Sequence, residues 1–162
     1  MLVTLLLALS ALAAQDSTAP GIVARLSRLA DPVAYVDVEA GHEKILFHWD
    51  KNAGLREGDG LRQGVAGMSE LFFPDDQSSV RCFGETALYL LESTPEKHVL
   101  RCDSVARMVV EAKGILLRLE LPGGTVLEAT NSWFRVQLDS LGRRYVIRNA
   151  GGVVTDDVIR SL

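Results

Sequence analysis

The chain has 162 residues, of which 48% are hydrophobic and 23% charged, and its formal net charge at pH 7 is −4. These proportions are those of a globular protein with one domain, or at most two small ones. They exclude a disordered tail, a collagen-like repeat and a polytopic membrane protein. The mild negative charge also argues against a nucleic-acid partner, because nucleic-acid-binding proteins usually carry a basic stripe.

The first 14 residues read MLVTLLLALSALAA and are apolar at all but two positions. A helix of that length would span roughly 20 Å, which is short for a hydrocarbon core of about 30 Å. Residues 11–13 form an A-x-A-like cleavage site, so residues 1–14 are interpreted as a signal peptide, although no Lys or Arg precedes them. The alternative is an uncleaved anchor. Either interpretation places the rest of the chain outside the cytoplasm, in the periplasm or secreted.

Apolar and polar residues alternate with a period of two at residues 34–39, 45–50, 117–121 and 134–139. This alternation predicts strands with one buried face, and Gly-, Pro- and Asp-rich turns separate the strands at short intervals. The clearest hairpin joins residues 115–121 to 125–129. We therefore expect an all-β fold, a single-domain β-sandwich (jelly-roll-like) of many short strands.

Two segments, residues 22–30 and 104–112, have apolar spacings that would also suit short helices. Both are interpreted as strands, because the pattern on either side of them is β. No repeat or low-complexity linker divides the chain after residue 14. We expect a flexible segment at residues 15–21, one domain at residues 22–154 and a short tail at residues 155–162.

The two cysteines, Cys82 and Cys102, each stand in a strand-like run. In an oxidising compartment such a pair is a candidate disulfide, which would stabilise the fold by roughly 3 kcal/mol. The alternative is two separately buried free thiols. The sequence leaves both open, because it does not give the separation of the two Cα atoms.

No pattern in the sequence indicates a catalytic or metal site. His42 and His48 have no second His or Cys three or four residues away, and His98 has Cys102 alone, short of the three or four ligands that a zinc site needs. We therefore interpret all three histidines as solvent-facing. The chain has no G-x-S-x-G motif. We expect no enzymatic activity, no cofactor and no metal.

The acidic residues of the turns are interpreted as structural. Asp75 and Asp76 lack the alternating oxygen ligands of a calcium loop and read as a turn between strands. Asp59 lies between two glycines with no phosphate-binding helix after it. We expect its carboxylate to accept hydrogen bonds from nearby backbone N–H groups.

Four large aromatic residues, Trp49, Trp133, Phe72 and Phe73, stand in strand-like runs and would be core residues in most sandwiches. In the alternating pattern of this strand, Trp133 falls on the opposite face from Phe134 and from the apolar residues after Phe134. It is therefore predicted to point outward and is the candidate binding aromatic, for a glycan or a partner strand.

Residues 55–90 read LREGDGLRQGVAGMSELFFPDDQSSVRCFGETALYL and resemble the FecR domain, an extracytoplasmic β-domain of bacteria. The resemblance extends loosely over residues 22–154. The positions that match the motifs of the family and carry structural roles are Leu55, Gly58, Asp59, Gly64, Asp75, Thr86, Phe134 and Gly151.

The chain departs from the FecR pattern at three places. The family's Asp-Gly-Ser turn is altered after Asp75, Gln63 stands where Thr is usual, and residues 131–133 replace a Gly-Thr pair. Regulators of this type also carry a cytoplasmic segment that acts on a sigma factor, followed by a transmembrane helix. Only the apolar residues 1–14 precede the domain here, so the anti-sigma activity is not implied.

The resemblance implies a non-catalytic exported domain that acts as a protein-interaction or signalling module of the bacterial cell envelope. The expected partner is another envelope protein, bound by edge-strand pairing, with no nucleic acid and no stable membrane span after signal cleavage. One alternative is a glycan- or cell-wall-binding module with exposed aromatics such as Trp133. The other is a small hydrolytic enzyme, in which His48 or His98 would meet Asp, Ser or Cys in a deep pocket.

Overall fold

The computed structural model describes residues 21–30, 33–37, 39–48, 50, 53–139, 142 and 145–149. These residues form twelve strands and no helix, which confirms the all-β prediction. The strands are β1 (Ala24–Ala30), β2 (Val33–Asp37), β3 (His42–Leu46), β4 (Ala53–Leu55), β5 (Gly60–Gln63), β6 (Met68–Phe72), β7 (Ser79–Ser93), β8 (Lys97–Ala112), β9 (Leu116–Glu120), β10 (Val126–Ala129), β11 (Ser132–Leu138) and β12 (Tyr145–Asn149). In the part of the chain described, no helix is long and apolar enough to cross a membrane.

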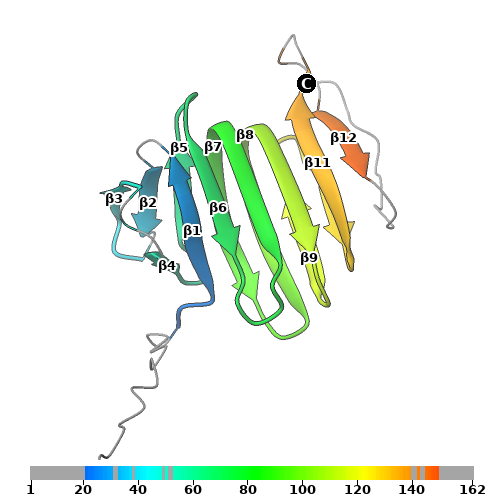
Figure 1. Ribbon diagram of the computed structural model, residues 1–162, viewed down its shortest axis with the longest axis horizontal. Helices are drawn as coiled ribbons and strands as arrows, with labels where there is room; N and C mark the ends of the chain where they lie inside the picture. Colours follow the sequence, from blue (N-terminus) through cyan, green and yellow to red (C-terminus); the bar gives the residue numbers. More distant parts are fainter. Residues whose placement is uncertain are drawn as a thin grey trace, which may run out of the picture.

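The strands form one mixed sheet with two halves, and the long antiparallel strands β7 and β8 run through both halves (Figure 1). The start of β7 pairs with β6 and its end pairs with β5. The end of β8 pairs with β11, and its start pairs in parallel with β9. The first half-sheet therefore has the order β12-β11-β8-β7-β6-β1-β4, and the second has the order β10-β9-β8-β7-β5-β2-β3.

The two half-sheets fold over each other because β7 and β8 bend in the middle. A straight strand of the 15 residues of β7 would span about 50 Å. Phe73 lies beside the start of β7, because its N–H donates to the carbonyl of Ser78 at 2.9 Å. Yet its ring stacks on His98, which pairs with the last residue of β7, at 3.8 Å between ring centroids. The bend lies at the register shift between Phe83 and Thr86, where Gly84 has φ +75°. Only glycine adopts this φ without strain, and such bulges are a usual way to turn a strand.

Alternate side chains of both half-sheets fill one core, as a period-two pattern requires. Fully buried core residues of the first half-sheet include Leu26, Leu71, Val80, Met108 and Phe134. Those of the second include Leu61, Leu88, Leu90, Leu100 and Leu117. The outward positions between them are available for function.

Most of the predicted strands are confirmed. β9 and β10 form the predicted hairpin, with Glu120 opposite Val126. The two segments with helix-like spacing are strands, namely β1 and the end of β8. The predicted strand at residues 45–50 is wrong, because the strand is His42–Leu46. The Phe47 N–H donates to Asp50 Oδ2 at 2.9 Å and the Asp50 N–H donates to Phe47 O at 2.8 Å, so a turn ends the strand. The predictions for residues 1–14, 15–20 and 155–162, for Trp49 and for Gly151 lie outside the described residues.

Candidate functional site

The outward face of the first half-sheet has a hollow over Val109, in the end of β8. Val109 is opposite Arg81 of β7 on one side and opposite Arg135 of β11 on the other. Its other neighbours on this face, two residues away along β8, are Arg107 and Glu111. All four neighbours have long side chains, so the short valine forms the floor of a depression between them.

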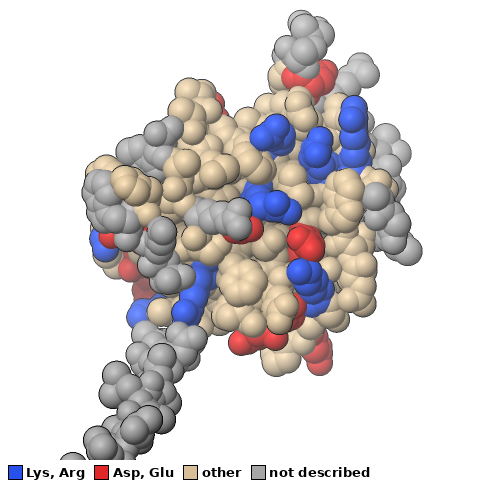
Figure 2. All heavy atoms as spheres, in the orientation of Figure 1, with Lys and Arg blue, Asp and Glu red and all other residues tan. Residues whose placement is uncertain are grey.

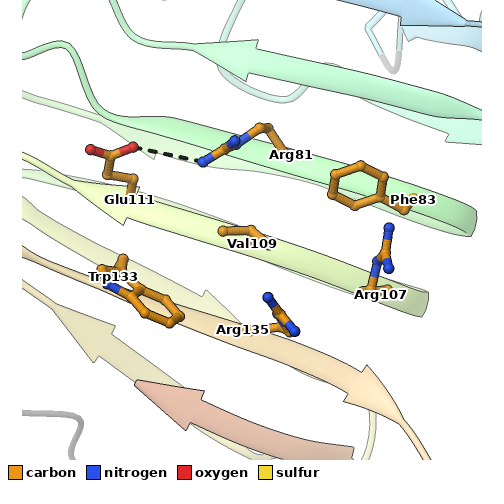
Figure 3. Close-up of a pocket in the computed structure, with 7 residues that line it drawn as sticks. All are labelled: Arg81, Phe83, Arg107, Val109, Glu111, Trp133 and Arg135. Atoms are coloured by element: carbon orange, nitrogen blue, oxygen red, sulfur yellow. Dashed lines mark ion pairs between the residues drawn. The ribbon is translucent and has the colours of Figure 1, made fainter. Parts of the chain in front are cut away.

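The hollow has a volume of about 450 Å³, within the usual size range of small-ligand sites. Its lining residues come from three adjacent strands and are Arg81, Phe83, Arg107, Val109, Glu111, Trp133 and Arg135 (Figure 3). Of these, only Trp133 was predicted from the sequence as a candidate binding residue. The sequence also contained a signal for Arg135. It stands two residues after Trp133, and alternate residues of a strand face the same side of the sheet.

The charges around the hollow do not balance. Glu111 lies 3.8 Å from the Arg81 guanidinium and 3.2 Å from Lys113 Nζ. The Arg107 guanidinium lies 4.3 Å from the centre of the Phe83 ring, a cation–π contact. Among the described residues, neither Arg107 nor Arg135 makes an ion pair with a carboxylate. The hollow therefore presents two guanidinium groups whose charge no described carboxylate offsets.

A second, smaller hollow of about 130 Å³ adjoins the first and shares Arg135 with it. Arg148 of β12, opposite Arg135 in the register, lines this second hollow, and so does one carboxylate, that of Asp139. Figure 2 shows Lys and Arg side chains gathered over β8, β11 and β12 on this face. The face is basic although the chain as a whole carries a net charge of −4.

Trp133 points outward and is 37% exposed, whereas its neighbour Phe134 is fully buried. This agrees with the alternation of apolar and polar residues in the sequence of β11. The indole lines the hollow, opposite Glu111 in the register. A role for Trp133 in binding stays a prediction.

A second accessible surface lies at the other end of the sheet, along β3. Within the part of the chain described, β3 pairs only with β2, so its other edge is open. Four of its five residues are exposed, and the exposed fractions of Ile45 and of nearby Phe47 are 50% and 37%. Glu43 and Lys44 place charges on this edge.

Asp59 has the structural role predicted from the sequence. Its Oδ2 accepts hydrogen bonds from the Arg56 N–H and from the Tyr35 hydroxyl, both at 2.7 Å. Burial and this carboxylate together raise the pKa of Tyr35 well above its usual value. Gly58, just before it, has φ +88°, which explains why glycine stands in this turn.

The other FecR motif positions also have structural surroundings. Leu55, Thr86 and Phe134 are buried, and Thr86 Oγ1 donates to the carbonyl of Gly84 at 3.2 Å. Gly64 lies in an open turn, and Asp75 is exposed. None of the motif residues in the described part of the chain lines either hollow.

His98 is the residue that the sequence misplaced. It was predicted to face solvent, and it is only 3% exposed. Its Nδ1 lies 2.9 Å from Ser93 Oγ and its Nε2 lies 3.4 Å from Asp76 Oδ1, while its ring stacks on Phe73. This Ser-His-Asp chain is part of neither hollow, and it joins the two half-sheets where their ends meet.

We expect His98 to make the protein less stable in mild acid. Burial lowers the pKa of His98, while its charged neighbours Asp76 and Asp75 offset part of the shift. The unfolded chain then takes up this proton near pH 6.5, before the folded chain does. The stabilisation is therefore complete above about pH 6.5 and is lost as the pH falls through the lower, folded pKa.

Urea unfolding of the parent and of His98→Gln between pH 7.5 and pH 5 checks this expectation. The difference in free energy of unfolding between the two should narrow as the pH falls. The exposed His42→Gln variant is the matched control and should follow the parent. Parallel pH curves for the parent and His98→Gln would contradict the assignment.

Both cysteines are free, buried thiols. Burial raises the pKa of Cys82 to about 12 and that of Cys102 well above its usual value. Both thiols are therefore protonated and unreactive at neutral pH, because the thiolate is the nucleophile. The structure therefore corresponds to the second interpretation of the sequence, two separately buried thiols, and does not contain the Cys82–Cys102 disulfide.

Comparison with protein-family models, with curated proteins and with solved structures finds no match in any of the three. Within the described residues, no group of three or more His, Cys, Asp or Glu could hold a metal ion. The fold and the hollow define an all-β domain with a preformed, basic hollow on one face.

Proposed function

We propose that this chain is a non-catalytic, FecR-like binding domain that works outside the cytoplasm, in the periplasm or secreted. It acts as a protein-interaction or signalling module of the bacterial cell envelope. The resemblance at residues 55–90 and the apolar start of the chain support this location. The buried His98 and the protonated thiols support a role without catalysis.

The observation that carries the proposal is the open edge of β3. An open edge exposes backbone N–H and C=O groups that can pair with an extended segment of another protein. Ile45 and Phe47 provide apolar contacts beside it. Lys44 is the kind of charged edge residue with which natural proteins limit the pairing of identical copies, whereas Glu43 is ion-paired with Arg62 at 2.9 Å. The partner is therefore an extended, partly apolar segment of a different envelope protein.

In-cell photo-crosslinking tests this proposal. A photoreactive amino acid at position 44, on the β3 edge, is compared with one at position 118, on β9. Arg118 is partly exposed and ion-paired with Glu128. We expect a mature chain about 14 residues shorter than the full sequence in the envelope fraction. We also expect a single envelope protein crosslinked from position 44, and its loss in Ile45→Asp.

Two outcomes would overturn the proposal. One is a full-length chain in the cytoplasm. The other is a crosslinking pattern that is the same from positions 44 and 118, or that survives Ile45→Asp. Because Ile45 is half exposed, this substitution should leave the circular dichroism spectrum and the Tm nearly unchanged.

A further inference from the structure

We propose that the hollow over Val109 binds a carboxylate-bearing sugar unit of an acidic polysaccharide. This site goes beyond the proposed protein interaction, because it lies on the first half-sheet whereas β3 lies on the second. Four features of the hollow determine the ligand that we propose. They are its charge, its exposed aromatic ring, the fully paired backbone of its middle strand and the second hollow beside it.

The charge selects an anion. Arg107 and Arg135 face the hollow without a carboxylate partner among the described residues, and a guanidinium can bind a carboxylate through two parallel N–H···O bonds. Glu111 does not cancel this charge, because Arg81 and Lys113 already pair with it. Arg81 adds no free charge to the hollow, because its guanidinium lies 3.8 Å from a carboxylate oxygen of Glu70 and 3.8 Å from one of Glu111.

The aromatic residues of the hollow favour a ligand that contains a sugar ring. Trp133 and Phe83 lie at opposite corners of the hollow, on either side of Val109 (Figure 3). The Arg107 guanidinium already covers one face of Phe83. Trp133 makes no ring contact within the described residues and is 37% exposed. Its indole can therefore pack against the apolar C–H face of a sugar ring while the arginines bind the carboxylate.

The surrounding backbone disfavours an acidic peptide. A bound peptide usually takes much of its affinity from main-chain hydrogen bonds at an open strand edge. Here the middle strand, β8, is paired on both sides, with β7 and with β11. The hollow therefore offers side chains only, which suits a ring with a charged substituent better than an extended chain.

The second hollow points to a polymer. Arg135 lines both hollows, and Arg148 lies opposite Arg135 on β12. Successive acidic sugars could place one carboxylate near Arg107 and Arg135 and the next near Arg148. A single sugar acid would use only the first of these positions.

Tryptophan fluorescence tests the proposal in the mature chain. The protein has two tryptophans, so Trp49→Phe leaves Trp133 as the only reporter. We expect a saturable change with tetragalacturonate, no change with neutral maltotetraose, and weaker binding at higher salt. Calorimetry of the chain with both tryptophans should give the same affinity.

Matched substitutions assign the binding to the hollow. Arg135→Gln is expected to weaken tetragalacturonate binding at least tenfold. Arg118 is a partly exposed arginine on β9 that is paired with Glu128, and Arg118→Gln should leave the binding unchanged. Equal weakening by both variants would mean a general charge effect and would overturn the site.

The remaining outcomes separate this proposal from the proposed protein interaction. Binding of hexaglutamate as tight as that of tetragalacturonate would indicate an acidic protein ligand instead. The absence of saturable binding of the sugar acid by both fluorescence and calorimetry would overturn the sugar site. Neither result would contradict the proposed protein interaction at β3. Arg135→Gln should leave the crosslink from position 44 intact, and Ile45→Asp should leave sugar binding intact.

Discussion

Replacing Phe73 with alanine is expected to lower the free energy of unfolding by about 3–5 kcal/mol. Phe73 is fully buried in the common core, and its ring stacks on His98. The substitution would leave a cavity where the two half-sheets meet, and it would remove the contact that shields the His98 ring from solvent. Urea unfolding monitored by circular dichroism measures the loss.

The neighbouring Phe72 provides the control for this prediction. It points to the other side of β6 and is only partly buried. Phe72→Ala should therefore cost clearly less than Phe73→Ala. Equal losses for the two variants would mean that Phe73 does not join the half-sheets in the way described.

Replacing Gly60 with alanine is expected to lower the free energy of unfolding by about 1–3 kcal/mol, the usual range for overpacking. Gly60 is opposite Tyr89 in the register of β5 and β7. A Cβ atom at position 60 would lie 2.5 Å from Tyr89 Cδ1 and 2.7 Å from the backbone oxygen of Leu88. The Tyr89 ring can rotate, but the backbone oxygen is held in the sheet, so the strands must separate.

Gly64→Ala is the matched control, four residues away. A Cβ atom at position 64 would meet nothing within 4 Å, and Gly64 has no positive φ. Its thermal unfolding midpoint should stay close to that of the parent, while that of Gly60→Ala falls. A midpoint for Gly60→Ala that matches the parent would show that β5 and β7 can adjust without loss.

In the function proposed here, each half-sheet of the domain binds a different partner. The open β3 edge would pair with a strand of an envelope protein, and the hollow over Val109 would hold an acidic polysaccharide. Such a domain would connect a protein to the carbohydrate around it. Variants at Ile45 and at Arg135 separate the two activities.

The sequence by itself determined the class of fold and the side of the sheet that many residues face. Alternation along residues 134–139 was enough to bury Phe134 and to expose Trp133, because side chains on a strand alternate between its faces. The turn at residues 122–124 was enough to join β9 to β10. The backbone hydrogen bond of Asp59 followed from local turn chemistry, since its donor is three residues away, whereas its contact with the Tyr35 hydroxyl did not.

Only the tertiary structure decided what lies beside these residues. His98 is buried because β7 and β8 bend and bring Phe73 and Asp76 onto it from the other half-sheet. The hollow exists because β11 pairs with β8 in the one register that places Arg135 beside Val109, which β7 flanks with Arg81. Alternation predicts the face of a residue, but the neighbours across strands depend on pairing between distant segments, which no local pattern encodes.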